Sequence, residues 1–155
     1  MHTRYIVSAI VQQNDNILLG RKAKGKPPYP DAWHLPGGGI EEPEQAAALI
    51  EKMELNDPYL HAELRREVME ELGIEITNIR CIVPEFRPTV RQAETVNKDG
   101  EPTHYYFLEY LCDFASGEVV PGDDLAEARW FSKDELKGLV LTPPSQEMYR
   151  ELGWI

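Results

Sequence analysis

The sequence has few cysteines and no long apolar run, and both shortages narrow the class of protein. Its 155 residues include two cysteines, Cys81 and Cys112, which have neither metal-ligand spacing nor the density of a disulfide framework. No stretch approaches the roughly 20 apolar residues that a membrane-spanning helix needs. The amino-terminal segment lacks the long apolar region of a signal peptide. We therefore expect a cytoplasmic protein with no membrane partner.

Basic residues are also scarce. The chain has 27 acidic and 16 basic residues, and its formal net charge is −11. Proteins that bind polymeric nucleic acid usually carry a basic stripe, so we expect no such partner. A small phosphorylated substrate remains compatible with an acidic protein, because a metal cation can bridge phosphate and carboxylates.

The order of β-favouring and helix-favouring segments predicts an α+β fold. Asn14-Asp15-Asn16 separates two apolar runs at 5–12 and 17–20, which predicts a β-hairpin. Further strands are expected at 74–83, 86–92, 103–114 and 127–131, and helices at 45–55, 58–72, 132–136 and from Pro143 to about Gly153. Since no repeat or linker interrupts the chain, we expect a single domain over 1–155 with a mixed sheet between helices.

A glycine-rich segment, WHLPGGGIE at 33–41, precedes the expected helices. It lacks the Gly-Lys-Ser/Thr ending of a phosphate-binding P-loop and the spaced glycines of a dinucleotide-binding fingerprint. We interpret the three glycines as a sharp turn rather than a nucleotide cradle.

The helix expected at 58–72 carries a stripe of carboxylates. On a helix of about 3.6 residues per turn, Glu63, Glu70 and Glu71 all lie within about 60° of Glu67. Like charges at this spacing repel, and a bound Mg²⁺ would relieve the repulsion by taking carboxylate ligands. The alternative is a solvated acidic surface, softened by pairs such as Arg66–Glu70. The helix by itself does not decide between the two.

Together, the glycine segment and the acidic helix resemble the Nudix box. The family pattern is Gly, five residues, Glu, seven residues, and then Arg-Glu-aliphatic-any-Glu-Glu-any-Gly-aliphatic. Gly38 and Glu44 match the first half, and every specified position from Arg66 through Gly73 to Ile74 matches the second. The resemblance extends over about residues 3–140, because the flanking strand-like segments follow the family's layout.

One departure separates this sequence from the family pattern. The family spacing would place the arginine at position 52, but it is Arg66, so 66 − 52 = 14 residues are inserted. We place the insertion at about 45–58. In the family, the glutamate at the position of Glu44 braces this arginine, and the insertion puts that pairing in question.

The resemblance implies a Nudix fold, a mixed sheet between helices, and hydrolysis of a phosphoric anhydride with Mg²⁺ or Mn²⁺. By position, Glu67, Glu70 and Glu71 would bind the metal, together with a backbone carbonyl at Gly37. The family often adds an acidic residue from a later strand, for which Glu127 is the candidate. An exposed strand glutamate is the alternative for Glu127.

The resemblance leaves the general base and the phosphate ligands open. Glu67 or Glu70 is nominated as the base, and Glu94 and Glu101 are outside candidates. The substrate-binding candidates are the basic residues before the glycines: Arg21, Lys22, Lys24 and Lys26. A solvated basic loop is the alternative for this cluster.

Several aromatic residues and two histidines receive no assigned role. Tyr29, Trp33, Tyr105 and Phe107 are stacking candidates for a base, although aromatic residues in such contexts more often belong to the core. His34 and His104 have no partner at metal-ligand spacing, so structural or surface roles are expected.

The leading functional hypothesis is hydrolysis of a nucleoside triphosphate to the monophosphate and pyrophosphate. One alternative is hydrolysis of ADP-ribose or another nucleotide sugar. Another is a non-catalytic Nudix-fold domain that senses a nucleotide or regulates a partner. The complete match from 66 to 74 argues against this last alternative, because a binding module does not need three aligned carboxylates. A homodimer is a further expectation, because homodimers are frequent in the family.

Overall fold

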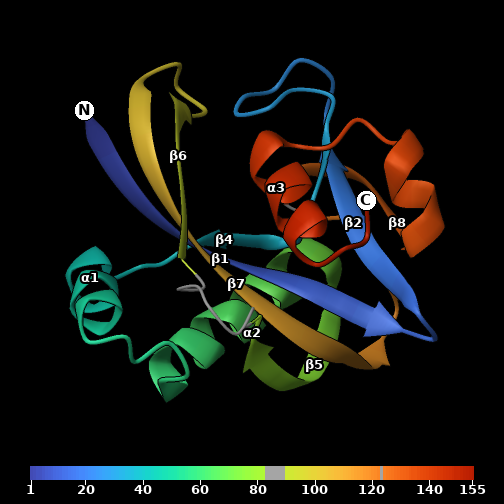
Figure 1. The fold of residues 1–155 in the computed structure, drawn as a ribbon, viewed down its shortest axis with the longest axis horizontal. Coiled ribbons are helices and arrows are strands. Elements are labelled where there is room, and N and C mark those ends of the chain that lie inside the picture. Colours follow the sequence, from blue (N-terminus) through green and yellow to red (C-terminus); the bar gives the residue numbers. More distant parts are fainter. Residues whose placement is uncertain (83–89, 123) are drawn as a thin grey trace.

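The computed structural model describes residues 1–82, 90–122 and 124–155, and a mixed sheet forms its centre (Figure 1). The strands are β1 (His2–Gln13), β2 (Asn16–Lys22), β3 (Trp33–His34), β4 (Gly37–Gly39), β5 (Ile74–Cys81), β6 (Val90–Val96), β7 (Pro102–Gly117) and β8 (Leu125–Ser132). The helices are α1 (Pro43–Glu51), α2 (Pro58–Leu72), the 3-10 helix η1 (Lys133–Gly138) and α3 (Pro143–Glu151). The expected α+β class is therefore confirmed.

The sheet is built around one parallel pair, β1 and β7, which runs in register from His2 opposite Thr103 to Gln12 opposite Asp113. The other strand pairs are antiparallel, including the predicted hairpin of β1 and β2. In the sheet, β4 and β7 lie on either side of β1. This arrangement gives three neighbouring strands, β4, β1 and β7, and residues of all three line the cavity described below.

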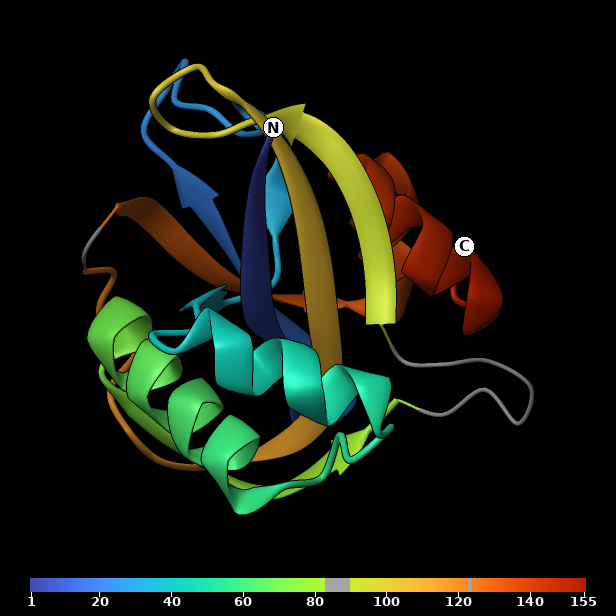
Figure 2. The same ribbon diagram turned by 90° about the vertical axis from the view of Figure 1, so that its left-hand side faces the viewer.

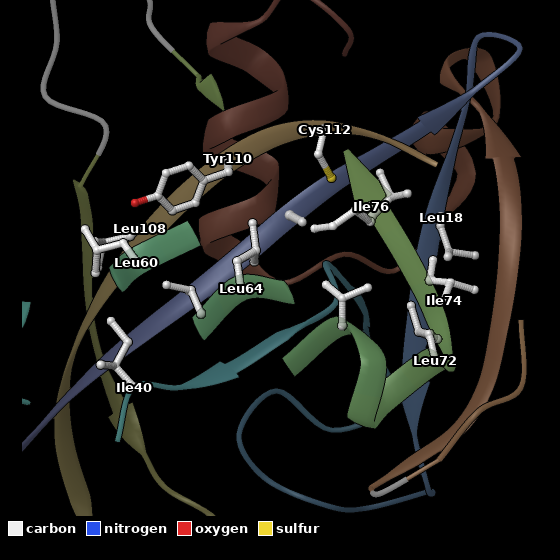
Figure 3. Packing of buried hydrophobic residues seen from close by; sticks show 14 of the residues in the cluster. Leu18, Ile40, Leu60, Leu64, Leu72, Ile74, Ile76, Leu108, Tyr110 and Cys112 are labelled. Atoms are coloured by element: carbon white, nitrogen blue, oxygen red, sulfur yellow. The ribbon is translucent and has the colours of Figure 1, made fainter. Parts of the chain in front are cut away.

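Apolar side chains cover both faces of the sheet. On one face, alternate residues of β1, including Val7 and Val11, belong to one hydrophobic core with residues of α2. Figure 3 shows Leu64 and Leu72 of α2 in this core. On the other face, Ile10 belongs to a second core that η1 and α3 complete. Figure 2 shows α1 and α2 together, with the carboxyl-terminal helix apart from them. The sheet is thus covered by helices on both faces, as the sequence predicted.

The helix α2 begins and ends where the sequence predicts. Asp57 caps its first turn by accepting a hydrogen bond from the Tyr59 backbone N–H at 2.9 Å, and Pro58 is the first helical residue. Gly73 ends the helix with a φ of 70°, a left-handed conformation that suits glycine. Because α1 ends before this cap, the acidic helix starts afresh and its register is independent of α1.

Two segments differ from the expectations. The strand expected at 86–92 is described only from Val90, where β6 begins, and residues 86–89 lie outside the described residues. The three glycines form the short strand β4 rather than a sharp turn. Among the helices that the structure describes, none is both long and apolar enough to cross a membrane.

Candidate active site

A cavity of about 390 Å³ opens beside the three strands β4, β1 and β7. Its lining includes Glu67, Glu70 and Glu71 of α2, Gly37–Gly39 of β4, Ile6 and Ser8 of β1, and Tyr105, Phe107 and Glu109 of β7. Lys22, Tyr29, His34, Lys98 and Asp124 line it from other elements. The cavity therefore joins the acidic helix to an aromatic surface of the sheet. Its volume is suitable for a small ligand.

The glycines of β4 bring the acidic helix against the sheet. A side chain at Gly37 would overlap the backbone carbonyl of Val7, and one at Gly38 would overlap the carboxylate of Glu67. Neither glycine has a positive φ. The expectation of a sharp turn is wrong because these glycines serve close approach, which is a second reason for glycine besides backbone freedom.

Three of the four glutamates of the predicted stripe line the cavity, and these three differ in how far they are exposed to solvent. Glu67 and Glu71 are 8% and 6% exposed, whereas the Glu70 side chain is 50% exposed. Glu71 accepts a hydrogen bond of 2.7 Å from the Gly37 backbone N–H, which ties α2 to β4. An Nη1 atom of Arg66 lies 3.0 Å from Glu67 and 3.2 Å from Glu70. The stripe is thus part of the site and not a fully solvated face.

The side chains of the cavity fit a metal ion in donor chemistry but not in their present arrangement. Within the part of the chain that the structure describes, no three acidic, histidine or cysteine side chains converge closely enough to hold one as they stand. The donor chemistry is nevertheless suitable, since Glu67, Glu70 and Glu71 offer hard oxygen ligands on one face of one helix.

Arg66 is braced by Glu63 rather than by Glu44. The carboxylate of Glu63 accepts hydrogen bonds from Arg66 at 2.8 Å and 2.5 Å, from the Tyr59 hydroxyl at 2.7 Å and from the Glu41 backbone N–H at 3.0 Å. Burial alone would raise the pKa of Glu63, but these hydrogen bonds outweigh it and lower the pKa. Glu63 is therefore a buried, charged partner of Arg66.

The structural role assigned to Glu44 by position in the family pattern is corrected. Glu44 is exposed in the first turn of α1, and its side chain is not among the partners of Arg66. The physical reason is the break before α2, which separates α1 from the acidic helix. The clue in the sequence was the spacing of Glu63 and Arg66, because residues three apart on a helix are neighbours.

The predicted basic cluster divides into one residue inside the cavity and others outside it. Lys22 lines the cavity, and burial lowers its pKa while the charges of Asp124 and Glu71 act in the opposite direction. Arg21 pairs with Glu127 and lies over the Trp33 ring, 4.6 Å from its centroid. Lys24 is exposed, and neither it nor Arg21 lines the cavity.

Glu127 lies outside the cavity, so its candidacy as a metal ligand is not supported. Its carboxylate pairs with Arg21 across β2 and β8 and with Arg129 at 3.3 Å. The hydrogen bond from Arg21 lowers the pKa of Glu127. The candidate bases Glu94 and Glu101 are likewise apart from the cavity lining, in pairs with His104 and His2.

Sequence reasoning missed two acidic residues of the cavity, Asp124 and Glu109. Asp124 lies in the loop before β8, where nothing in the local pattern marked it. Glu109 is a buried glutamate in the apolar strand β7, and its carboxylate accepts a hydrogen bond of 3.1 Å from Arg91. Burial raises the pKa of Glu109 to about 7, although Arg91 opposes the shift. A single acidic residue within an apolar strand was the available signal.

Comparison with known proteins places this site in context. The model of the NUDIX domain family matches residues 61–152, more than half of the chain. Nucleoside triphosphatase NudI from Enterobacter sp. (strain 638) is 27% identical to the chain over 155 residues, and the alignment covers 99% of both proteins.

Solved structures also resemble the chain. A MutT NUDIX hydrolase from Burkholderia pseudomallei superposes with a TM-score of 0.60 at 20% identity, and the match covers 100% of this chain and 99% of that one. An ADP-ribose pyrophosphatase from Streptococcus suis has a TM-score of 0.56 at 19% identity, covering 97% of this chain and 87% of that one. These structures establish the fold, and the predicted mixed sheet between helices is confirmed.

Proposed function

This chain belongs to the Nudix family of pyrophosphohydrolases, and on that premise we propose that it hydrolyses nucleoside triphosphates to the monophosphate and pyrophosphate. The observation that carries the proposal is the shared cavity. This cavity of about 390 Å³ is lined by the three glutamates of α2, Glu67, Glu70 and Glu71, together with Lys22 and the aromatic residues of β7. The similarity to nucleoside triphosphatase NudI along the whole chain supports a triphosphate as substrate.

The proposed cofactor is Mg²⁺ or Mn²⁺. Glu67, Glu70 and Glu71 are its proposed ligands, together with a backbone carbonyl at Gly37, and the absence of a side chain at Gly38 lets the Glu67 carboxylate lie against β4. When bound, such a cation neutralises phosphate charge and lowers the pKa of bound water. Activity assays with each ion distinguish between the two metals.

The side chains of this protein have separate tasks in the proposed reaction. Lys22 is the proposed phosphate ligand, because it lines the cavity and its positive charge interacts there with the charges of Asp124 and Glu71. Glu67 or Glu70 is the proposed base that accepts a proton from the attacking water. Arg66 contacts both of these carboxylates and fixes their positions, and Glu63 in turn holds Arg66.

The proposal is tested by a substrate panel with the purified full chain. Ribonucleoside and deoxyribonucleoside triphosphates, ADP-ribose and nucleotide sugars are incubated with Mg²⁺ or Mn²⁺, and the products are separated by anion-exchange chromatography. We expect nucleoside monophosphate and pyrophosphate from at least one triphosphate, and no turnover with EDTA.

Three outcomes contradict the proposal in different ways. Turnover of ADP-ribose or a nucleotide sugar but of no triphosphate would establish the alternative substrate class. Release of orthophosphate instead of pyrophosphate would place the cleavage at another bond. Nucleotide binding without any metal-dependent turnover would indicate a non-catalytic sensor.

A further inference from the structure

A buried polar atom in the cavity, His34 Nε2, has no hydrogen-bond partner among the described residues. Among the described side chains, three buried polar atoms lack a partner, and two of these, His34 Nε2 and the Tyr105 hydroxyl, belong to residues that line the cavity. Arg4 lies close to the Tyr105 hydroxyl, where its charge and a hydrogen bond from its guanidinium oppose the rise that burial causes in the Tyr105 pKa, so the protein itself has a donor within reach of this hydroxyl. Since folded proteins satisfy most buried polar groups, the unpartnered His34 Nε2 at this cavity points to a group of a bound molecule as its partner.

The hydrogen bond of the other ring nitrogen defines what His34 Nε2 can do. Nδ1 lies 2.9 Å from the backbone carbonyl oxygen of Leu35. A carbonyl oxygen only accepts, so Nδ1 carries the proton, and Nε2 of the neutral ring presents a lone pair. Burial lowers the pKa of His34 to about 4, so the ring is neutral near pH 7. His34 Nε2 is therefore an acceptor that needs a donor from the ligand.

Only part of a nucleotide can supply that donor. Ionised phosphate oxygens are acceptors, so the phosphate chain cannot satisfy His34. The donor must come from the base or the sugar. The cavity favours the base, because Tyr105 and Phe107 stack with their ring centroids 5.7 Å apart and an interplanar angle of 14°. Tyr105 is buried, whereas Phe107 is partly exposed, so a base can stack on the Phe107 ring with Tyr105 packed against it.

The strand order separates this aromatic surface from the box glutamates. Phe107 lies opposite Ile6 of β1, which in turn lies opposite Gly39 of β4. Neighbouring strands are about 4.8 Å apart, so β7 and β4 are about 10 Å apart. This distance leaves space for a sugar and part of the phosphate chain between a base at β7 and phosphates near α2.

From these observations we propose that His34 determines specificity by accepting a hydrogen bond at Nε2 from an N–H group of the substrate's base. The inference rests on the proposed function, because it requires a nucleotide in the cavity. It differs from the expectation that His34 has a structural or surface role. Loss of one such bond leaves a buried acceptor unpaired, which corresponds to a tenfold to hundredfold loss of kcat/KM, as an order of magnitude.

The test couples one change in the protein to one change in the ligand. For the base that the substrate panel prefers, kcat/KM is measured with the parent triphosphate and with an analogue lacking one N–H donor. The pairs are adenosine and purine riboside, guanosine and inosine, cytidine and 2-pyrimidinone riboside, and uridine and 3-methyluridine triphosphates. Each pair is measured with the wild type, with His34→Leu and with His34→Gln.

We expect the kcat/KM of the wild type to be about tenfold or more lower with the analogue than with the parent. His34→Leu removes the acceptor but keeps apolar bulk. Its kcat/KM with the parent should therefore fall as far as that of the wild type with the analogue, and using the analogue with this variant should lower kcat/KM little further. His34→Gln offers an amide oxygen as acceptor and should recover part of the preference. If His34→Leu instead lowers kcat/KM by the same factor relative to the wild type for the parent and for the analogue, His34 has a structural role and the proposal is overturned. A loss that follows the 2′-hydroxyl in matched deoxynucleotides would assign the donor to the sugar and also overturn it.

A binding measurement separates this proposal from the proposed function. The wild type with ¹⁵N-labelled histidine is titrated with a non-hydrolysable α,β-methylene nucleotide, and the ring nitrogen signals are recorded by NMR. We expect the His34 Nε2 signal to shift toward that of a hydrogen-bonded acceptor, and the parent base to shift it more than the analogue lacking the donor. Saturable binding without this shift would overturn the role of His34. Failure of all triphosphates to turn over, with the shift present, would overturn only the proposed catalysis.

Discussion

Two arginines of this protein each contact three carboxylates within 3.2 Å, yet the two clusters have different consequences. The Arg66 cluster consists of Arg66, Glu63, Glu67 and Glu70, and the Arg91 cluster consists of Arg91, Glu109, Glu147 and Glu151. Each cluster has more acidic than basic groups. The comparison shows two ways in which a protein accommodates excess negative charge.

The Arg66 cluster is confined to one helix and opens toward the cavity. Its members are three or four residues apart or adjacent on α2, so the helix itself forces the carboxylates together. The Arg66 side chain is 30% exposed. Because Glu67 and Glu70 also line the cavity, the excess charge of this cluster is available to a bound cation.

The Arg91 cluster joins three elements and is more enclosed, although one member, Glu109, also lines the cavity. Arg91 of β6 contacts Glu109 of β7 and two glutamates of α3, and its side chain is 10% exposed. Here burial raises the pKa of Glu109 to about 7, so protonation can remove part of the excess charge. Similar groups therefore form a proposed cation site where they lie along an open cavity, and they tie three elements together where the arginine is enclosed.

The largest effect is expected from Glu71→Gln, which removes a carboxylate beside the Arg66 cluster. The glutamine carbonyl can still accept the hydrogen bond from Gly37 N–H, so the fold should survive, as circular dichroism would confirm. Loss of a metal ligand should lower kcat by about a hundredfold or more. Activity near that of the wild type would contradict the metal assignment.

A smaller loss is expected from Glu63→Gln, which weakens the brace inside the Arg66 cluster. Without its charged partner, Arg66 should pair more strongly with Glu67 and Glu70 and compete with the metal. We expect about a tenfold to hundredfold higher Mg²⁺ concentration for half-maximal activity.

The matched control for this prediction is Glu44→Gln, which changes an exposed glutamate of α1. We expect its Mg²⁺ dependence to stay within about twofold of the wild type, as for surface substitutions away from special features. Equal effects of the two variants would refute the transfer of the bracing role from Glu44 to Glu63.

The Arg91 cluster is tested by the pH dependence of stability in Glu109→Gln. The pKa of Glu109 is raised from 4.5 to about 7, so below pH 4.5 the carboxyl is protonated in both folded and unfolded states and contributes nothing. As the pH rises from 4.5 to 7, ionisation favours the unfolded state, and above pH 7 the cost is constant. The wild type should therefore lose up to about 3 kcal/mol relative to Glu109→Gln across this window.

Urea unfolding of both proteins from pH 4.5 to pH 8 measures this difference. The contribution of His34 to stability changes with pH in the opposite direction. Its pKa is lowered from 6.5 to about 4, so this contribution is lost as the pH falls through that range. It is present in both proteins and cancels in the comparison. A stability difference that does not change with pH would show that Glu109 has no raised pKa in the folded protein.

The smallest effect is expected from Glu127→Gln, because Glu127 belongs to neither cluster. Its partners are Arg21 and Arg129, outside the cavity lining. We expect kcat and the Mg²⁺ dependence to remain within about twofold of the wild type, since exposed ion pairs contribute little. A loss comparable with that of Glu71→Gln would return Glu127 to the metal site.

Local signals in the sequence predicted much of the fold. Asp57, Pro58 and Gly73 marked both ends of α2, because caps and helix breakers act within a few residues. The carboxylate stripe was also predictable, since helical geometry alone places Glu67 beside Glu71. The cavity lining confirms that these residues share one surface, although their roles in catalysis remain predictions.

The remaining parts depend on contacts between distant segments. The glycines of β4 are required by Val7 and Glu67, which no local pattern connects to them. The pairing of Glu109 with Arg91 depends on the register of β6 and β7. Glu127 was misplaced for a similar reason, because its position on β8 opposite Arg21 is set by strand pairing.

The brace between Glu63 and Arg66 also affects how the chain tolerates changes in length. Both residues lie on α2, so their separation is fixed by the helix and does not change when residues are added or removed before Pro58. An arginine held by a partner on the far side of a loop would have to adjust to every such change. The segment from α1 to the start of α2 is thereby a place where the chain can gain or lose residues while the geometry of the acidic helix is preserved.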